Sequence, residues 1–297
     1  MPSGSQCRAL NDRSMVIIIG HSGFIGRHLF QHFKNAGRHV VGISSRDCDL
    51  TQPKQVRHWF ADKERPFHLI HAAVINRNQC HEYAAFLNNC KLVQNVLAAL
   101  PPGRCRSLIY LSSVDVYGNC PPCPITEQTA PAPAHYYALS KWTCEQLLRL
   151  FPGRGFPVAI LRLPGVYGAG DCGQSLLGKL WRQVHDRQAI ILSGNGCSQR
   201  DLINVDDLAT LVDALLDRPQ DILLNVASGK SLSLLDIIAL IGEKCRCQPT
   251  IILQPDISPA ADLIFNSQKL RDLFPRPIIR ALEDGIDDYH AALDCQE

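Results

Sequence analysis

The stretch MVIIIGHSGFIG, residues 15–26, decides the fold of this 297-residue chain. Residues 15–20 are a short apolar run, rich in β-branched side chains and ended by glycine, which is typical of a buried parallel strand. Residues 24–37 carry apolar side chains at helical spacing and end in glycine, which predicts a helix. The turn between this strand and this helix therefore carries three glycines, at positions 20, 23 and 26.

A glycine turn in this context is typical of proteins that bind a dinucleotide. Glycine permits the tight turn and lets the backbone approach a pyrophosphate, which the N–H groups at the helix N-terminus bind. The spacing is G-x-x-G-x-x-G rather than G-x-G-x-x-G, so an ordinary glycine-rich turn is the alternative. The residues that we expect to contact the cofactor here are Gly20, Ser22, Gly23, Phe24, Ile25 and Gly26.

Predicted strands and helices alternate through the rest of the N-terminal half. This alternation indicates βαβ units and an α/β fold with a Rossmann-type, doubly wound parallel sheet. The second half is less regular and indicates a smaller C-terminal α/β substrate lobe. Further predicted strands lie at 39–44, 68–74, 107–113, 158–168, 189–196 and 221–228, and further predicted helices at 53–63, 84–100, 136–151, 175–187, 205–217 and 233–245.

We expect three parts along the chain. Residues 1–13 are predicted to be a flexible lead, residues 14–168 an NAD(P)-binding domain, and residues 169–297 mostly a substrate-binding lobe. The chain is expected to return to the Rossmann sheet around residues 201–228. The proline-rich stretch 120–135 is a long irregular segment, and such loops are usually functional or mobile.

The composition is that of an ordinary globular protein, with 46% hydrophobic residues, 20% charged residues and a formal net charge of +2. It predicts no binding to nucleic acid or membrane, and no apolar run approaches the ~18–20 residues of a membrane span. Thirteen scattered cysteines without a secretory signal predict free thiols in a reducing cytoplasm. A zinc or redox role for Cys120/Cys123 or Cys245/Cys247 is the alternative, but no second pair completes a four-ligand pattern, so we expect no metal.

The end of the second predicted strand bears on the choice of dinucleotide. An acidic residue there would hold the 2′-hydroxyl of NAD, but Ser44 stands in that place. Arg46 follows closely and could hold a 2′-phosphate, which favours NADP over NAD. Alternatively, Arg46 is a surface charge whose attraction Asp47 weakens. Asp49 and Leu50 could cap the next helix or contact adenine, and we favour adenine.

The stretch HYYALSK, residues 135–141, places a phenol one helical turn before an ammonium. Tyr137 and Lys141 are four residues apart and share a helix face, whereas Tyr136 does not pair with Lys141 in this way. A nearby ammonium lowers the pKa of a phenol from ~10, so such a tyrosine can exchange protons with a sugar hydroxyl or ketone. Ser113 or Ser112 could bind the same oxygen. A surface Tyr–Lys pair is the alternative.

Together with these stretches, several other motifs resemble, in order, those of the extended short-chain dehydrogenase/reductase family. The resemblance runs from about residue 15 to residue 290. Members of this family include nucleotide-sugar epimerases, dehydratases and 4-keto reductases. The further motifs are HAA (71–73), LSSVDVYG (111–118), YALSK (137–141), LRLPGVYG (161–168), RDLINVDDLA (200–209) and NVASGKSLSLLDI (225–237).

The resemblance implies a role for each matching residue. Tyr137 matches the catalytic acid/base, Lys141 the residue that lowers its pKa and holds the nicotinamide ribose, and Ser113 the catalytic serine beside the substrate. Arg200 matches an arginine that pairs with a nucleotide-sugar diphosphate; a salt bridge to Asp201 or Asp206 is the alternative. The remaining implied cofactor contacts are Ala72, Ala73, Asn88 and Pro164.

Departures from the family pattern narrow the choice among the reactions that family members catalyse. Dehydratases carry an acidic pair just before VYG, whereas this chain has Val114 and Asp115, which argues against dehydration. A site built for NADP suggests a cofactor that arrives reduced and leaves oxidised, as in a reductase. The stretch SSRDCDLTQ, residues 44–52, also resembles the matching part of GDP-fucose synthases, which use NADPH, although VYG and the rest of the chain are not close to that enzyme.

Other departures bear on the substrate. Epimerases commonly have Asn where this chain has Gly165, and they carry a second phosphate arginine near 252–262, which has none. The nucleotide-sugar interpretation therefore rests largely on Arg200. Our first hypothesis is NADPH-dependent reduction of a keto group on a nucleotide-activated deoxysugar. The alternatives are an NAD-dependent nucleotide-sugar epimerase and a non-catalytic NADP-sensing protein.

The resemblance also implies a homodimer. Family members usually pair through two long helices, which here are residues 84–100 and 136–151, into a four-helix interface. Apolar side chains on these helices could line that interface or the core of the subunit. They include Phe86, Val93, Trp142 and Leu147.

Overall fold

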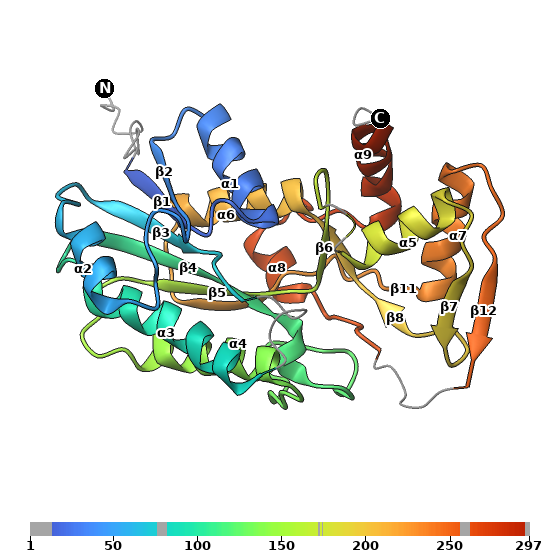
Figure 1. The fold of residues 1–297 in the computed structure, drawn as a ribbon, viewed down its shortest axis with the longest axis horizontal. Coiled ribbons are helices and arrows are strands. Elements are labelled where there is room, and N and C mark those ends of the chain that lie inside the picture. Colours follow the sequence, from blue (N-terminus) through green and yellow to red (C-terminus); the bar gives the residue numbers. More distant parts are fainter. Residues whose placement is uncertain (1–13, 76–81, 172, 174, 256–261, 295–297) are drawn as a thin grey trace, which may run out of the picture.

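A computed structural model describes residues 14–75, 82–171, 173, 175–255 and 262–294 of the chain. Its centre is a sheet of six parallel strands in the order β2–β1–β3–β4–β5–β10 (Figure 1). The predicted Rossmann-type sheet is thus confirmed. The strands are β1 (Met15–Ile19), β2 (Val40–Ile43), β3 (Phe67–His71), β4 (Cys105–Ser113), β5 (Val158–Leu163) and β10 (Ile222–Asn225).

Helices cover both faces of this sheet, as a parallel sheet requires. Figure 1 shows α1 (Phe24–Asn35) and α6 (Val205–Asp217) on one face, and α3 (Tyr83–Ala99) and α4 (Tyr136–Leu150) on the other. The short helix α2 (Pro53–Ala61) packs beside α3. Every residue of β1 is buried, which explains why its sequence is an uninterrupted apolar run.

The strand order reverses between β1 and β3. From β1 the chain crosses to β2 on one side and then returns to β3 on the other, so the two crossover helices lie on opposite faces. In open α/β sheets a crevice forms at such a reversal, beyond the carboxyl ends of the strands. The glycine turn after β1 and residues Ala72 and Ala73 after β3 lie at this point.

A second, smaller lobe is built mainly from the C-terminal half and lies on the right in Figure 1. Its helices α5 (Leu176–His185), α7 (Leu234–Lys244) and α9 (Leu282–Asp294) share a core that includes Trp181 and Tyr289. Its strands form three pairs. They are β6 (Gly165–Tyr167) with β9 (Leu202–Asn204), β7 (Ile190–Ser193) with β12 (Ile251–Gln254), and β8 (Gln199–Arg200) with β11 (Leu232–Ser233).

One predicted strand, residues 158–168, is divided in the structure. β5 ends at Leu163 because Pro164 has no N–H to continue the sheet hydrogen bonds, and the chain then joins a different sheet as β6. The other predicted elements are present with shifted ends. Elements that the sequence did not predict are the 3₁₀ helix η1 (Val114–Tyr117), the helices α8 (Gln268–Leu273) and α9, and the strands β8, β9, β11 and β12.

The proline-rich loop between η1 and α4 is anchored rather than loose. Ile125 exchanges backbone hydrogen bonds with Ile264 and Asn266, and the Ala132 N–H donates to the Val116 carbonyl at 2.9 Å. These contacts fix the loop to η1 and to the segment that precedes α8. Across the described ranges, no helix is both long and apolar enough to cross a membrane. The predicted lead, residues 1–13, lies outside the described residues.

Candidate active site

The glycine turn after β1 is shaped by close backbone contacts. A Cβ on Gly20, whose φ is +86°, would lie 2.7 Å from the Ala73 nitrogen, and one on Gly26 would lie 2.1 Å from the Gly20 carbonyl oxygen. A Cβ on Gly23 would meet only the Gly20 oxygen, at an ordinary 3.5 Å. The protein's own packing therefore requires glycine at positions 20 and 26 but leaves open space at position 23.

The start of α1 is free of side-chain caps. Gly23 is its N-cap and makes no side-chain hydrogen bond, and no acidic residue stands in the first turn. The first N–H groups of a helix have no partner within the helix and favour an anion. The exposed Ser22 and Gly23 thus border a position where a pyrophosphate could bind.

At the end of β2, Asp47 is held by Ser44. The Ser44 N–H and hydroxyl donate to the Asp47 carboxylate at 2.8 and 2.6 Å, and these hydrogen bonds lower the pKa of Asp47. The guanidinium of Arg46 is exposed and forms no ion pair with any residue that the structure describes. Arg46 is therefore available to a ligand, while the neighbouring carboxylate is engaged by Ser44.

Asp49 and Leu50 are placed in local packing. The Asp49 carboxylate accepts from the Thr51 N–H at 2.9 Å and the Thr51 hydroxyl at 2.8 Å, which caps the turn that leads into α2. Leu50 is buried in the core, and its carbonyl accepts from Asn95. Asp49 does not cap α2 itself, whose N-cap is Gln52 without a side-chain hydrogen bond, so the adenine contact of Asp49 and Leu50 stays a prediction.

Lys141 reaches the site from inside the protein. It is only 3% exposed; its ammonium donates to the Leu111 carbonyl at 2.6 Å and lies 5.8 Å from the centroid of the Tyr137 ring. Burial lowers the pKa of Lys141 to about 8. Tyr137 is half-buried, whereas Tyr136 points outward and contacts Tyr83. The Lys141 ammonium thus lies near Tyr137 and not Tyr136, although the ring centroid of the buried Tyr110 is nearer still, at 5.0 Å.

The two serines at the end of β4 have different partners. The Ser112 hydroxyl donates to the buried Glu145 carboxylate at 2.6 Å. The Ser113 oxygen instead accepts from the Asp115 N–H at 3.1 Å and caps η1, which leaves its own hydrogen available to donate. Of the two candidates, Ser113 is therefore the serine whose hydroxyl can bind a substrate oxygen.

A buried ion pair lies next to Ser112 at the end of β4. The Arg162 guanidinium donates to both oxygens of Glu145, at 3.0 and 2.6 Å, and lies 4.7 Å from the centroid of the Tyr117 ring. Tyr117 in turn donates to the Asn225 side chain at 2.6 Å. Sequence reasoning missed this network, although Glu145 follows Lys141 by four residues on the same helix face.

The remaining cofactor candidates meet at the strand ends. Ala72 donates to the Ile19 carbonyl, so it adjoins the glycine turn, and Pro164 is buried directly after β5. Asn88 is only half-buried on α3. Its neighbour Asn89 is buried, and its side-chain amide binds the Ile75 backbone and the Ser140 hydroxyl. The cofactor contact of Asn88 stays a prediction.

Arg200 lies half-buried on β8, where its guanidinium donates to the Gln199 carbonyl at 2.7 Å. The two carboxylates proposed as alternative partners have other contacts. Asp201 accepts from Ser228 and Gly229, and burial raises the pKa of Asp201 to about 6. Asp206 contacts the His28 ring at 3.1 Å.

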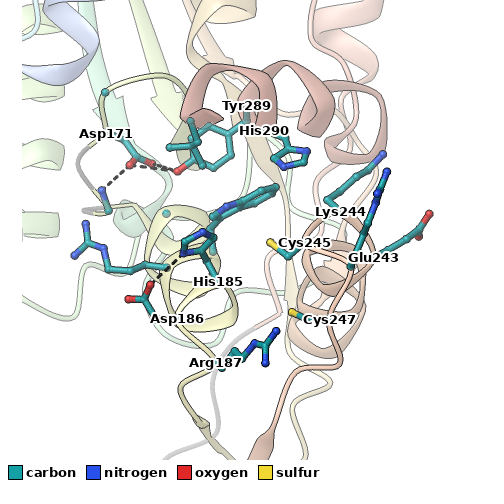
Figure 2. Close-up of a pocket in the computed structure, with 17 residues that line it drawn as sticks. Asp171, His185, Asp186, Arg187, Glu243, Lys244, Cys245, Cys247, Tyr289 and His290 are labelled. Carbon is teal, nitrogen blue, oxygen red and sulfur yellow. Dashed lines mark hydrogen bonds and ion pairs between the residues drawn. The ribbon is translucent and has the colours of Figure 1, made fainter. Parts of the chain in front are cut away.

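A separate hollow lies in the smaller lobe between α5, α7 and α9 (Figure 2), and its volume is about 1090 Å³. Arg187 and Arg246, which follow the ends of α5 and α7, contribute to its lining. Cationic side chains at helix C-termini offset the partial negative charge there, so their gathering has a structural cause. No predicted site residue lines this hollow. Within the described residues, no cluster of His, Cys, Asp and Glu is placed to hold a metal ion.

Comparison with known proteins gives one matching family model, relatives named as nucleotide-sugar enzymes, and solved structures of the same fold. The family model "NAD dependent epimerase/dehydratase family" matches residues 16–227. A probable GDP-L-fucose synthase of Oryza sativa is 26% identical over 92% of this chain and 90% of its own length. The GDP-6-deoxy-D-mannose reductase of Pseudomonas aeruginosa is 27% identical over 81% of this chain and 83% of its own. A crystal structure of Thermus thermophilus UDP-glucose 4-epimerase with NAD shares the fold, with a TM-score of 0.83 at 20% identity over 94% of this chain and 99% of its own.

Proposed function

Because this chain belongs to the NAD-dependent epimerase/dehydratase family, we propose that it reduces a keto group on a nucleotide-activated deoxysugar with NADPH. The observation that supports this proposal is that Lys141 lies beside Tyr137 on α4 and reaches the Leu111 carbonyl of β4, the strand that ends at Ser113. The relatives named as a GDP-fucose synthase and a GDP-6-deoxymannose reductase support the class of reaction.

The chemistry that bound NADPH supplies is hydride transfer to the carbonyl carbon. Ser113 donates its hydroxyl hydrogen to the carbonyl oxygen, since its own oxygen is already an acceptor for the Asp115 N–H. Tyr137 gives its phenolic proton to that oxygen as negative charge develops there. Lys141, charged and buried beside the Tyr137 ring, stabilises the phenolate that remains.

The cofactor preference rests on the end of β2. Ser44 binds Asp47, and Arg46 lies exposed beside it. A guanidinium suits a 2′-phosphate, and the open space at Gly23 with the uncapped start of α1 suits a pyrophosphate. These features favour NADP. Arg200 of the smaller lobe is our candidate for the diphosphate of the sugar nucleotide, and Ala73 and Pro164 for contacts to the cofactor.

The smaller lobe is proposed to bind the substrate, and α3 and α4 to form a homodimer interface. Exposed Tyr83, Leu87 and Tyr136 at the ends of these helices support such an interface. Val93 does not belong to it, because this side chain is buried in the core. Light scattering should give twice the mass of one chain.

The test is the reverse reaction on a panel of sugar nucleotides. Purified protein is given NADP⁺ or NAD⁺ with GDP-6-deoxy-D-mannose, GDP-L-fucose or UDP-glucose, and the reduced cofactor is followed by absorbance. We expect NADP⁺ reduction with a GDP-deoxysugar. Tyr137→Phe should abolish it, whereas the matched control Tyr136→Phe should retain it. If both variants keep the activity of the wild type, the assignment of Tyr137 as the proton donor is wrong.

An epimerase is the second candidate, because the epimerase structure named above shares the fold over nearly its whole length. An epimerase reuses a bound cofactor within each cycle. NAD released on denaturing the purified protein, together with interconversion of UDP-sugars without net cofactor reduction, would favour it. A protein that binds NADP but oxidises no sugar would favour the non-catalytic alternative.

A further inference from the structure

Asp115 and His135 face each other across the two ends of the proline-rich loop. Asp115 belongs to η1, and this helix begins directly after Ser113. His135 directly precedes Tyr136, the first residue of α4. The His135 Nε2 atom lies 3.7 Å from the Asp115 Oδ2 atom, which is an ion-pair distance.

The contacts of His135 define its tautomer. Its Nδ1 atom accepts a hydrogen bond from the Ala138 N–H at 3.2 Å and so caps α4. A ring nitrogen that accepts a hydrogen bond carries no proton. In the neutral ring the hydrogen is therefore on Nε2, on the side of the Asp115 carboxylate.

Each member of the pair also contacts a residue of the proposed catalytic group. The Asp115 N–H donates to the Ser113 oxygen at 3.1 Å. The His135 ring stacks on the Tyr137 ring, with centroids 6.2 Å apart and planes inclined by 20°. A continuous chain of contacts thus runs from Ser113 through Asp115 and His135 to Tyr137.

Neither capping nor stability alone accounts for this arrangement. Asn, Asp, Ser and Thr are the preferred N-cap residues, so the cap alone would not select histidine. The two side chains are 32% and 22% exposed, and partly exposed ion pairs contribute little to stability. The Asp115–His135 pair adds a side-chain contact to the packing of α4 against β4 and η1, and this contact joins the segment of Ser113 to the segment of Tyr137.

We propose that the Asp115–His135 pair positions the Ser113 and Tyr137 hydroxyls relative to each other for catalysis. This inference rests on the proposed function, since it assumes that both hydroxyls act on one carbonyl oxygen. Both residues act through their neighbours and are positioning residues. Misplacement of reacting groups by about an ångström costs up to ~100-fold in rate.

The test uses Asp115→Asn, His135→Asn and the double variant in the full-length chain. Asparagine at position 135 keeps a capping side chain but loses the ring, and asparagine at position 115 keeps the N–H that Ser113 accepts. The control is His185→Asn, which removes a histidine–carboxylate contact of 3.1 Å on the surface of the smaller lobe. For each protein, kcat and KM are measured on the active sugar of the panel, together with the dissociation constant for NADPH and the melting temperature.

We expect each single variant to lower kcat by ~10-fold or more, with KM for the sugar, NADPH affinity and melting temperature unchanged. Because both variants weaken the same linkage, the double variant should lose no more kcat than the more impaired single variant. Additive losses, a rise in KM alone, an unchanged kcat or a loss explained by unfolding would each overturn the proposal. His185→Asn should behave as the wild type.

A second readout separates this inference from the proposed function. If the wild type oxidises no sugar of the panel, the proposed function fails, and the pair is judged from the NMR signals of the Tyr137 ring carbons, assigned with Tyr137→Phe. The pair predicts that Asp115→Asn shifts these signals as His135→Asn does. Signals that stay in place in Asp115→Asn would overturn it.

Discussion

Replacing Glu145 by glutamine should be among the most damaging single changes in this protein. Glu145 is fully buried, and its carboxylate accepts two hydrogen bonds from the guanidinium of Arg162, which is 2% exposed. The amide cannot neutralise the guanidinium. A buried positive charge without its counter-ion remains, and the contact with the Ser112 hydroxyl is weakened as well.

The expected magnitude follows from the burial of both partners. Removing one member of a buried ion pair costs about 3–5 kcal/mol, because the other charge is left uncompensated. Exposed pairs are worth about 0–1 kcal/mol. Arg154 and Asp221 form such a pair near the start of β5, with Asp221 mostly exposed. Since whole domains are stable by about 5–15 kcal/mol, Glu145→Gln should remove a large share of the total.

Urea unfolding followed by circular dichroism tests this difference. Glu145→Gln should lower the unfolding free energy by about 3–5 kcal/mol, and the matched control Asp221→Asn by less than about 1 kcal/mol. A double change, Glu145→Leu with Arg162→Met, should be less harmful than Glu145→Gln because no lone charge remains. Equal, small costs for Glu145→Gln and Asp221→Asn would refute the reasoning.

Three further predictions concern the cofactor site. Gly26→Ala should lower the melting temperature, because its Cβ would lie 2.1 Å from a backbone oxygen. Gly23→Ala should keep the fold, because its Cβ meets only an ordinary contact, but should weaken NADPH binding as measured by calorimetry. Arg46→Ala should weaken NADP⁺ binding on the order of tenfold without affecting NAD⁺, whereas the exposed Arg57→Ala on α2 should change neither dissociation constant. The pKa of Lys141 is lowered by burial to about 8, from 10.5 in the unfolded chain, so the unfolded state binds the extra proton between these values and stability should rise with pH through this window. Lys141→Met should remove this rise, which is on the order of 2 kcal/mol between about pH 8 and about pH 10, as urea unfolding at the two pH values would show.

Most of the Rossmann half could be predicted from the sequence because its signals are local. An uninterrupted apolar run such as 15–20 is typical of a strand buried on both faces, and helical spacing with a glycine stop marks α1. The strands of the smaller lobe were harder to predict from the sequence, because β8 and β11 have two residues each and pair only through tertiary contacts. No local pattern predicts such pairs.

The candidate site, too, could be predicted from the sequence only in part. Tyr137 and Lys141 could be paired from their spacing, because a helix places residues four apart on one face. The choice between Ser112 and Ser113 could not be made from the sequence. It depends on which side of β4 faces Glu145, and neighbouring strand residues point to opposite faces. The sequence likewise could not show that Asn89 is buried while Asn88 is half-buried, because these neighbours differ by a rotation of one residue around α3.

The exposure of the proposed NADP contact favours a reductase over an epimerase on physical grounds. Arg46 and Asp47 lie on the surface at the end of β2, where salt screens charges and an ion pair with a 2′-phosphate contributes modestly. A cofactor held partly by such a contact can leave after each hydride transfer, as reduction by free NADPH requires. An epimerase needs the opposite, because its reduced cofactor must stay until the hydride returns.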